Sequence, residues 1–157
     1  MGVSRIELEI FADYHQFMVQ DESTEGHLGD SWTKEATARM LAVAPMIVGV
    51  GTARNVDVPV EVEVVDADPG GDDAADLITE ASLDAPSGKL MILGPSDYGP
   101  DADRMELPEG RYRARIFYYG LGTLSADGLE GEDRYRVVLW RQDETIEPRV
   151  VVDRRKK

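Results

Sequence analysis

Four aspartates in the segment 66–73 have the composition of a calcium-binding loop. The segment is Asp66-Ala-Asp68-Pro-Gly-Gly-Asp72-Asp73, and calcium binds six to eight oxygen atoms, several of which alternate aspartates can supply. The proline, the two glycines and the lack of a closing glutamate at position 12 differ from the EF-hand spacing. A solvated turn has the same composition. We therefore predict no metal and no cofactor, and keep calcium binding at Asp66, Asp68, Asp72 and Asp73 as an alternative.

His15 lies two residues after Asp13 in a segment between two strand-like stretches. A histidine beside an orienting carboxylate can act as a general base near neutral pH, and side chains two residues apart on a strand share a face. However, the sequence has no nucleophile-elbow serine and no glycine-rich phosphate loop. Two histidines without cysteine also make a poor zinc set. We predict a hydrogen-bonded His15 and a protein that is not an enzyme.

The charge of the chain is strongly acidic, with a formal net value of −14. Between Arg54 and Lys89 there are ten carboxylates and no basic residue. Such a surface repels nucleic acid, because nucleic-acid binding depends on lysine and arginine. It attracts cations or a basic protein groove instead. We therefore predict a protein partner and no nucleic-acid partner.

Alternating apolar and polar residues predict strands along most of the chain. The clearest are 6–11, 58–65, 111–118 and 134–139, and weaker ones are 16–20 and 46–52. Residues 80–84 and 89–93 are expected to form a hairpin around the turn at 85–88. Only 33–42 has the composition of a helix, and Pro45 bounds it. The fold class predicted is mainly β, an antiparallel β-sandwich of about seven or eight strands with one short helix.

A single acidic domain is expected over residues 1–153, followed by a disordered basic tail at 154–157. The N-terminal residues lack an apolar signal-peptide region, and no apolar run approaches the ~20 residues that span a bilayer. The chain contains no cysteine, which favours a reducing compartment. We expect a cytoplasmic protein without a membrane partner.

The acidic contact surface is predicted on two segments, 61–76 and 127–133. Glu61 and Glu63 share the solvent face of one strand, and Arg111, Arg113 and Arg115 share a face of another. The two rows are expected to pair across strands, whereas the acidic loops have few basic residues nearby in sequence. The predicted partner-binding residues are Glu61, Glu63, Asp66, Asp68, Asp72, Asp73, Asp76, Asp127, Glu130, Glu132 and Asp133.

Four short motifs are Tyr14-His-Gln-Phe17, Trp32-Thr-Lys-Glu-Ala36, Arg54-Asn55 and Leu107-Pro-Glu-Gly-Arg-Tyr112. Together they resemble the competence protein J family of small bacterial inhibitors of a DNA-entry nuclease. The resemblance covers about residues 8–55 and 107–119, while 66–104 and 129–140 are expanded relative to the family pattern. It implies an inhibitor or immunity protein that neutralises a nuclease, which agrees with the acidic charge.

Three other interpretations remain open at this point. A calcium- or ligand-binding β-sandwich module would use the 66–73 loop, and a small enzyme would use His15 with nearby carboxylates. A salt-adapted or highly soluble protein would carry the same acid excess without a partner.

Overall fold

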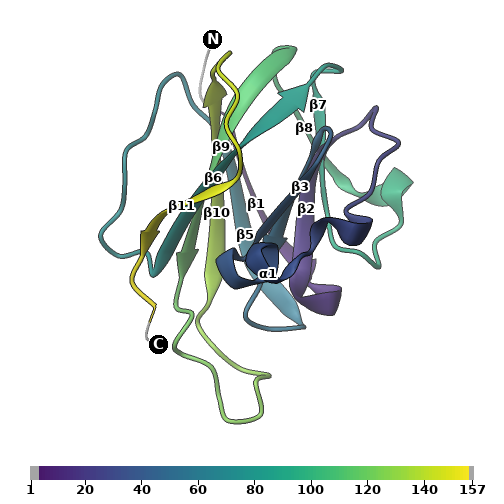
Figure 1. The fold of residues 1–157 in the computed structure, drawn as a ribbon. Coiled ribbons are helices and arrows are strands. Elements are labelled where there is room, and N and C mark those ends of the chain that lie inside the picture. Colours follow the sequence, from purple (N-terminus) through teal and green to yellow (C-terminus); the bar gives the residue numbers. More distant parts are fainter. Residues whose placement is uncertain (1–3, 156–157) are drawn as a thin grey trace.

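Two β-sheets pack face to face in the computed structural model, which describes residues 4–155 (Figure 1). The first sheet contains, in spatial order, β1 (Ser4–Phe11), β5 (Asp57–Val64), β10 (Arg134–Arg141), β9 (Gly110–Tyr119), β6 (Leu77–Ala85) and β11 (Arg149–Asp153). The second contains β3 (Leu41–Ala44), β4 (Ile47–Gly51), β2 (Gln16–Asp21), β7 (Lys89–Leu93) and β8 (Asp103–Glu106). The helical elements described are α1 (Lys34–Arg39) and the short 3-10 turns η1 (Asp13–His15), η2 (Gly29–Ser31) and η3 (Gly99–Asp101).

The predicted mainly-β fold is confirmed, with eleven strands in residues 4–155 rather than seven or eight. Neighbouring strands are antiparallel except β5 and β10, which are parallel. Alternate residues of the strands point between the sheets and form the main core, because a period of two places them on one face. At its centre the Tyr135 ring lies edge-on to Phe17 and to Tyr118, each with centroids 6.0 Å apart.

The predicted helix over 33–42 is wrong at its C-terminal end. The helix begins after Thr33, whose hydroxyl accepts a hydrogen bond from the Ala36 N–H at 3.1 Å. It ends at Arg39, because Met40 takes the left-handed conformation with φ of 58°. Residues 41–44 then form β3 and pair with β4. Their burial in the sheet outweighs the helix propensity of Leu41 and Ala42.

The predicted hairpin around residues 85–88 is also wrong, although both of its strands exist. β6 pairs with β9 and β11 in the first sheet, whereas β7 pairs with β2 and β8 in the second. The turn at 86–88 therefore carries the chain from one sheet to the other. Alternation identified the strands, but it cannot show which neighbour a strand bonds to.

The outer face of the six-stranded sheet is covered by two segments that lie far apart in sequence. The loop 65–76 and the segment 142–148, which leads into the edge strand β11, run along it (Figure 1). A small apolar cluster of Ala75, Ile78, Phe117, Tyr119 and Val138 lies on this face. Much of the face is therefore buried, and charged side chains on it are buried with the cluster.

The C-terminal residues are hydrogen-bonded to the end of the 65–76 loop. The Arg154 backbone N–H donates to the Asp76 carbonyl at 2.7 Å, and its Nη1 donates to the Ala75 carbonyl at 2.7 Å. Arg155 pairs with Asp153 at 2.9 Å. These two residues of the predicted tail thus have defined contacts, and Lys156 and Lys157 lie outside the described residues.

Four connecting segments gather at one end of the sandwich, which we call the loop end: residues 11–15, 52–57, 94–102 and 120–133. Hydrogen bonds join them in series, from Ser96 to Asp13, from His15 N to Asn55 at 3.1 Å, and from Arg54 to the Leu129 carbonyl at 3.4 Å. η1 and the 120–133 loop lie at the lower end of the view in Figure 1.

No helix in residues 4–155 is long and apolar enough to cross a membrane.

Candidate protein-binding surface

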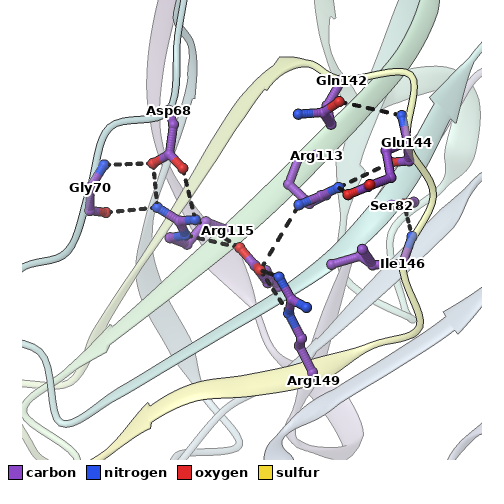
Figure 2. Close-up of polar contacts among 10 residues, drawn as sticks. Asp68, Gly70, Ser82, Arg113, Arg115, Gln142, Glu144, Ile146 and Arg149 are labelled. Carbon is purple, nitrogen blue, oxygen red and sulfur yellow. Dashed lines mark hydrogen bonds and ion pairs between the residues drawn. The ribbon is translucent and has the colours of Figure 1, made fainter.

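Asp68 and Glu80 belong to a network of ion pairs on the outer face of the six-stranded sheet (Figure 2). Arg115 of β9 reaches Asp68 from Nη1 at 2.6 Å and Glu80 of β6 from Nη2 at 2.8 Å. The guanidinium also donates to the Gly70 carbonyl at 2.9 Å, so it fixes the 65–76 loop to the sheet. Arg149 of β11 closes the network from the other side of Glu80.

The pKa values of the two carboxylates follow from these contacts. Hydrogen bonds from Arg115 and from the Gly70 N–H lower the pKa of Asp68 below its ordinary 3.8. Burial would raise the pKa of Glu80, but hydrogen bonds from Arg149 and Arg115 outweigh it, so this pKa lies below 4.5. Both groups are therefore ionised at neutral pH, and their charge is matched inside the fold.

Glu61 and Glu63 of β5 are partly buried and paired with arginines from both neighbouring strands. Arg136 of β10 lies 3.6 Å from Glu61 and 2.7 Å from Glu63, and Arg5 of β1 also pairs with Glu61. The prediction that acidic and basic side chains pair across strands is correct. The predicted partners are wrong, because Glu61 and Glu63 pair with Arg5 and Arg136 and not with the arginines of β9. The arginines of β9 pair instead with β6 and the 65–76 loop, because β10 separates β9 from β5.

The remaining aspartates of the 65–76 loop have mixed environments. Asp72 accepts from the Ala74 N–H at 2.9 Å and the Tyr119 hydroxyl at 2.7 Å, and these bonds lower its pKa. Asp76 accepts from the Leu121 N–H at 2.8 Å. Asp66 and Asp73 are exposed, with Arg154 lying 3.7 Å from Asp73. Protein donors thus engage three of the four calcium candidates, and within residues 4–155 no cluster of three or more His, Cys, Asp or Glu could hold a metal ion.

Asp133 is fully buried, so the structure places it away from any contact surface. It pairs with Arg54 and accepts from the Tyr135 hydroxyl at 2.6 Å, while that hydroxyl accepts from the Ala53 N–H at 2.7 Å. Burial first, and then the Asp133 carboxylate, raise the pKa of Tyr135. Asp133 was predicted to have no basic partner because none lies nearby in sequence. That prediction is wrong, because its partner Arg54 is distant in sequence.

Asp127, Glu130 and Glu132 are exposed on the 120–133 loop at the loop end. Backbone and hydroxyl contacts shape the loop, including Ser125 N to the Glu130 carbonyl at 2.8 Å and Glu132 N to Thr123 Oγ1 at 2.7 Å. The Ser125 hydroxyl and the Leu129 N–H lower the pKa of Asp127. In the described structure no arginine or lysine pairs with these three carboxylates.

His15 and Asp13 do not form a dyad. A ring nitrogen of His15 lies 3.2 Å from the Thr52 carbonyl oxygen, and Asp13 accepts from Ser96 and from the Tyr14 N–H instead. The hydrogen-bonded histidine predicted from the sequence agrees with this contact. The arrangement offers no carboxylate to orient the imidazole as a base.

Residues 94–102 of the loop end, together with Asp103 at the start of β8, are a segment that sequence reasoning overlooked. The segment holds Asp97, Tyr98, Asp101 and Asp103 and contains no basic residue. Its fixed place beside Phe11 and Asp13 comes from contacts with β1 and η1. Its acidic and aromatic composition is the signal that could have identified it.

Comparison with known proteins gives a fold but no sequence family. No family model matches the chain, and no curated protein sequence matches it. The crystal structure of ComJ, inhibitor of the DNA degrading activity of NucA, from Bacillus subtilis, superposes with a TM-score of 0.69 and 16% identity, covering 90% of this chain and 100% of that one. The structure of crocagin biosynthetic gene J gives a TM-score of 0.62 and 16% identity, with 90% and 99% coverage. The resemblance seen in the motifs is therefore confirmed as a shared fold: this chain has the fold of ComJ.

Proposed function

We propose that this chain is a non-enzymatic inhibitor or immunity protein that binds a nuclease and covers its basic DNA-binding cleft with an acidic surface. The observation that carries the proposal is the ComJ fold over 90% of a chain whose net charge is −14. A nuclease cleft is basic because it binds phosphates. An acidic protein can occupy such a cleft, gain faster association from electrostatic attraction, and exclude DNA without chemistry of its own.

The predicted contact residues divide into two groups by their environment. Glu61, Glu63, Asp68, Asp72, Asp76 and Asp133 are occupied by partners within the fold, and we assign them to its stability. Asp66, Asp73, Asp127, Glu130 and Glu132 are exposed. We propose that Asp127, Glu130 and Glu132 contact the nuclease, because the loop that bears them projects from the loop end.

A bacterial cytoplasmic setting is part of the proposal. The chain has no cysteine, which suits a reducing compartment, and ComJ comes from Bacillus subtilis.

The test is DNA degradation by the purified nuclease whose gene lies nearest the gene of this chain. Stoichiometric protein is expected to suppress degradation at low salt, and the suppression is expected to weaken as salt screens the charges. Replacing Asp127, Glu130 and Glu132 with their amides should weaken inhibition about tenfold, because charges at an interface speed association. The matched control removes the same charge from exposed residues away from the loop end, as Glu109→Gln, Asp143→Asn and Glu147→Gln. Unimpeded DNA degradation at all salt concentrations would overturn the proposal.

A further inference from the structure

Three exposed aromatic residues at the loop end lie within two residues in sequence of Asp13 or Ser96, whose side chains are hydrogen-bonded to each other. Phe11 ends β1, Tyr14 lies in η1 and Tyr98 precedes η3, and their exposed fractions are 40%, 75% and 70%. The carboxylate of Asp13 accepts from the Ser96 hydroxyl and so ties the first segment to the second. Exposed aromatic rings gathered from separate segments are a feature of protein interfaces, where such residues are enriched.

Carboxylates without basic partners lie beside one of these rings, that of Tyr98. Glu9, Asp97, Asp101 and Asp103 line a hollow of about 270 Å³ together with Tyr98. Asp97 accepts from the Gly94 N–H at 2.8 Å, and within residues 4–155 no lysine or arginine pairs with any of the four or with Asp13. This contrasts with the outer face of the six-stranded sheet, where arginines neutralise the carboxylates.

Arg104 is the basic residue that follows this acidic segment in sequence, and its ion pair is with Glu22 rather than with a carboxylate of the segment. Its Nε pairs with Glu22 at 2.9 Å, and its Nη1 donates to the Ala102 carbonyl at 2.5 Å. Within the described residues, the negative charge of these carboxylates is therefore not balanced by an ion pair. It is available to a positively charged partner.

The backbone holds Tyr14 in a fixed and sparsely populated conformation. Tyr14 and His15 both have positive φ, 57° and 58°, which non-glycine residues rarely adopt. The conformation is maintained by the His15 N–H donating to Asn55 at 3.1 Å and by the Thr52 N–H donating to the His15 carbonyl at 2.9 Å. A ring presented from a fixed backbone loses less conformational freedom when it binds.

We propose that this aromatic edge, comprising Phe11, Tyr14 and Tyr98 with Glu9, Asp13, Asp97, Asp101 and Asp103, anchors a basic protein partner. The proposal rests on the proposed function and identifies its partner as the arginine- and lysine-rich rim of a nuclease cleft. The rings of Tyr14 and Tyr98 give the buried contacts and stack on guanidinium or ammonium groups. The carboxylates give complementary charge and speed association. Nucleic acid does not fit, because the edge would repel its phosphates.

The first test replaces the two most exposed rings and measures the dissociation constant for the same nuclease by calorimetry. Tyr14→Ala with Tyr98→Ala should weaken binding about 30-fold or more, as expected for aromatic residues at the centre of an interface. Tyr14→Phe retains the ring and should stay within about threefold of wild type. The control is Val150→Ala with Val151→Ala, two exposed apolar residues at the opposite edge of the six-stranded sheet. These should bind like wild type.

A second test separates local charge from total charge. Asp97→Asn, Asp101→Asn and Asp103→Asn should slow association about tenfold at low salt, because steering depends on charge near the interface. The variant Glu109→Gln, Asp143→Asn and Glu147→Gln removes the same total charge and should associate as wild type does.

The outcomes distinguish this proposal from the one on which it rests. If wild-type protein does not bind the nuclease, the proposed function fails and the aromatic edge loses its partner. If wild-type protein binds and inhibits, but the double alanine variant binds as tightly, only the aromatic edge is overturned. Equal slowing by the two charge variants would also overturn it.

Discussion

Arg115 donates from both Nε and Nη2 to a single carboxylate oxygen of Glu80, at 3.1 and 2.8 Å, on the sheet face that points away from the main core. Glu80 is 2% exposed, and a second arginine, Arg149, binds its other oxygen. A third guanidinium, that of Arg113, lies 4.0 Å away and has a buried Nε without a hydrogen-bond partner. The single carboxylate of Glu80 thus lies close to the guanidinium groups of Arg113, Arg115 and Arg149 on the outer face of the sheet.

Glu80→Gln is expected to destabilise the fold strongly. The substitution preserves shape but removes the buried carboxylate that Arg113, Arg115 and Arg149 share, and breaking a buried pair typically costs about 3–5 kcal/mol. Urea denaturation at pH 7 measures the change. The control is Asp84→Asn, which removes the exposed partner of Arg111, 2.8 Å away, and should cost less than about 1 kcal/mol. Similar losses in the two variants would contradict the central role of Glu80.

Stability is expected to depend on pH through the same carboxylates. The pKa values of Asp68 and Glu80 are lowered in the folded protein. Their stabilising contributions are therefore complete above the unfolded values of 3.8 and 4.5, and are lost as pH falls through the lower folded values. The difference in unfolding free energy between wild type and Glu80→Gln should stay constant from pH 7 to about pH 6 and shrink below about pH 4.5. A difference that persists unchanged to pH 3 would refute this linkage.

Tyr135→Phe tests the buried hydrogen bonds that join Ala53, Tyr135 and Asp133 and so support the loop end. Losing the hydroxyl leaves the Ala53 N–H without its acceptor and the Oδ2 atom of Asp133 without its donor, at a cost of about 1–3 kcal/mol. Thermal denaturation should show a lower midpoint, and amides in the 52–57 segment should exchange faster. Tyr14→Phe removes a hydroxyl from an exposed ring and is expected to change neither the denaturation midpoint nor the amide exchange at 52–57. Unchanged exchange at 52–57 in Tyr135→Phe would show that the hydroxyl does not hold this segment.

Gly94→Ala tests how closely the 94–102 segment approaches β1. A Cβ at position 94 would collide with the Phe11 carbonyl oxygen and crowd Ile10. Because backbone cannot yield as a flexible side chain does, we expect a loss of about 1–3 kcal/mol. At Gly71 a Cβ meets nothing within 4 Å, so Gly71→Ala should leave the denaturation midpoint nearly unchanged. Equal midpoints for the two variants would argue against close packing at Gly94.

The strands with strict alternation could be predicted from sequence because one face of each is apolar. β1, β5, β9 and β10 are of this kind. The first two residues of β3, Leu41 and Ala42, were predicted as helix because propensity favours it, and the buried pairing with β4 decides otherwise. β8 and β11 could not be predicted from alternation. β8 has only four residues, and β11 has consecutive valines without alternation and a bulge between Val150 and Val152.

The contact surface was harder to predict than the fold, since charge in sequence does not show charge in space. Arg115 lies 47 residues from Asp68, and Arg54 lies 79 residues from Asp133. Both carboxylates were predicted to lack basic partners, and both have one. Conversely, the 94–103 segment was overlooked because its place beside β1 and η1 is set by contacts between residues far apart in sequence.

The most direct measurement is a competition between this protein and DNA for the nuclease whose gene lies nearest its own. Fluorescently labelled protein is titrated with that nuclease in the absence of divalent metal, so that DNA binds without being cut, at several concentrations of unlabelled duplex DNA. If the acidic surface occupies the DNA-binding cleft, the apparent dissociation constant should rise in proportion to DNA concentration. An affinity unaffected by DNA, or a stable complex containing all three components, would contradict the account.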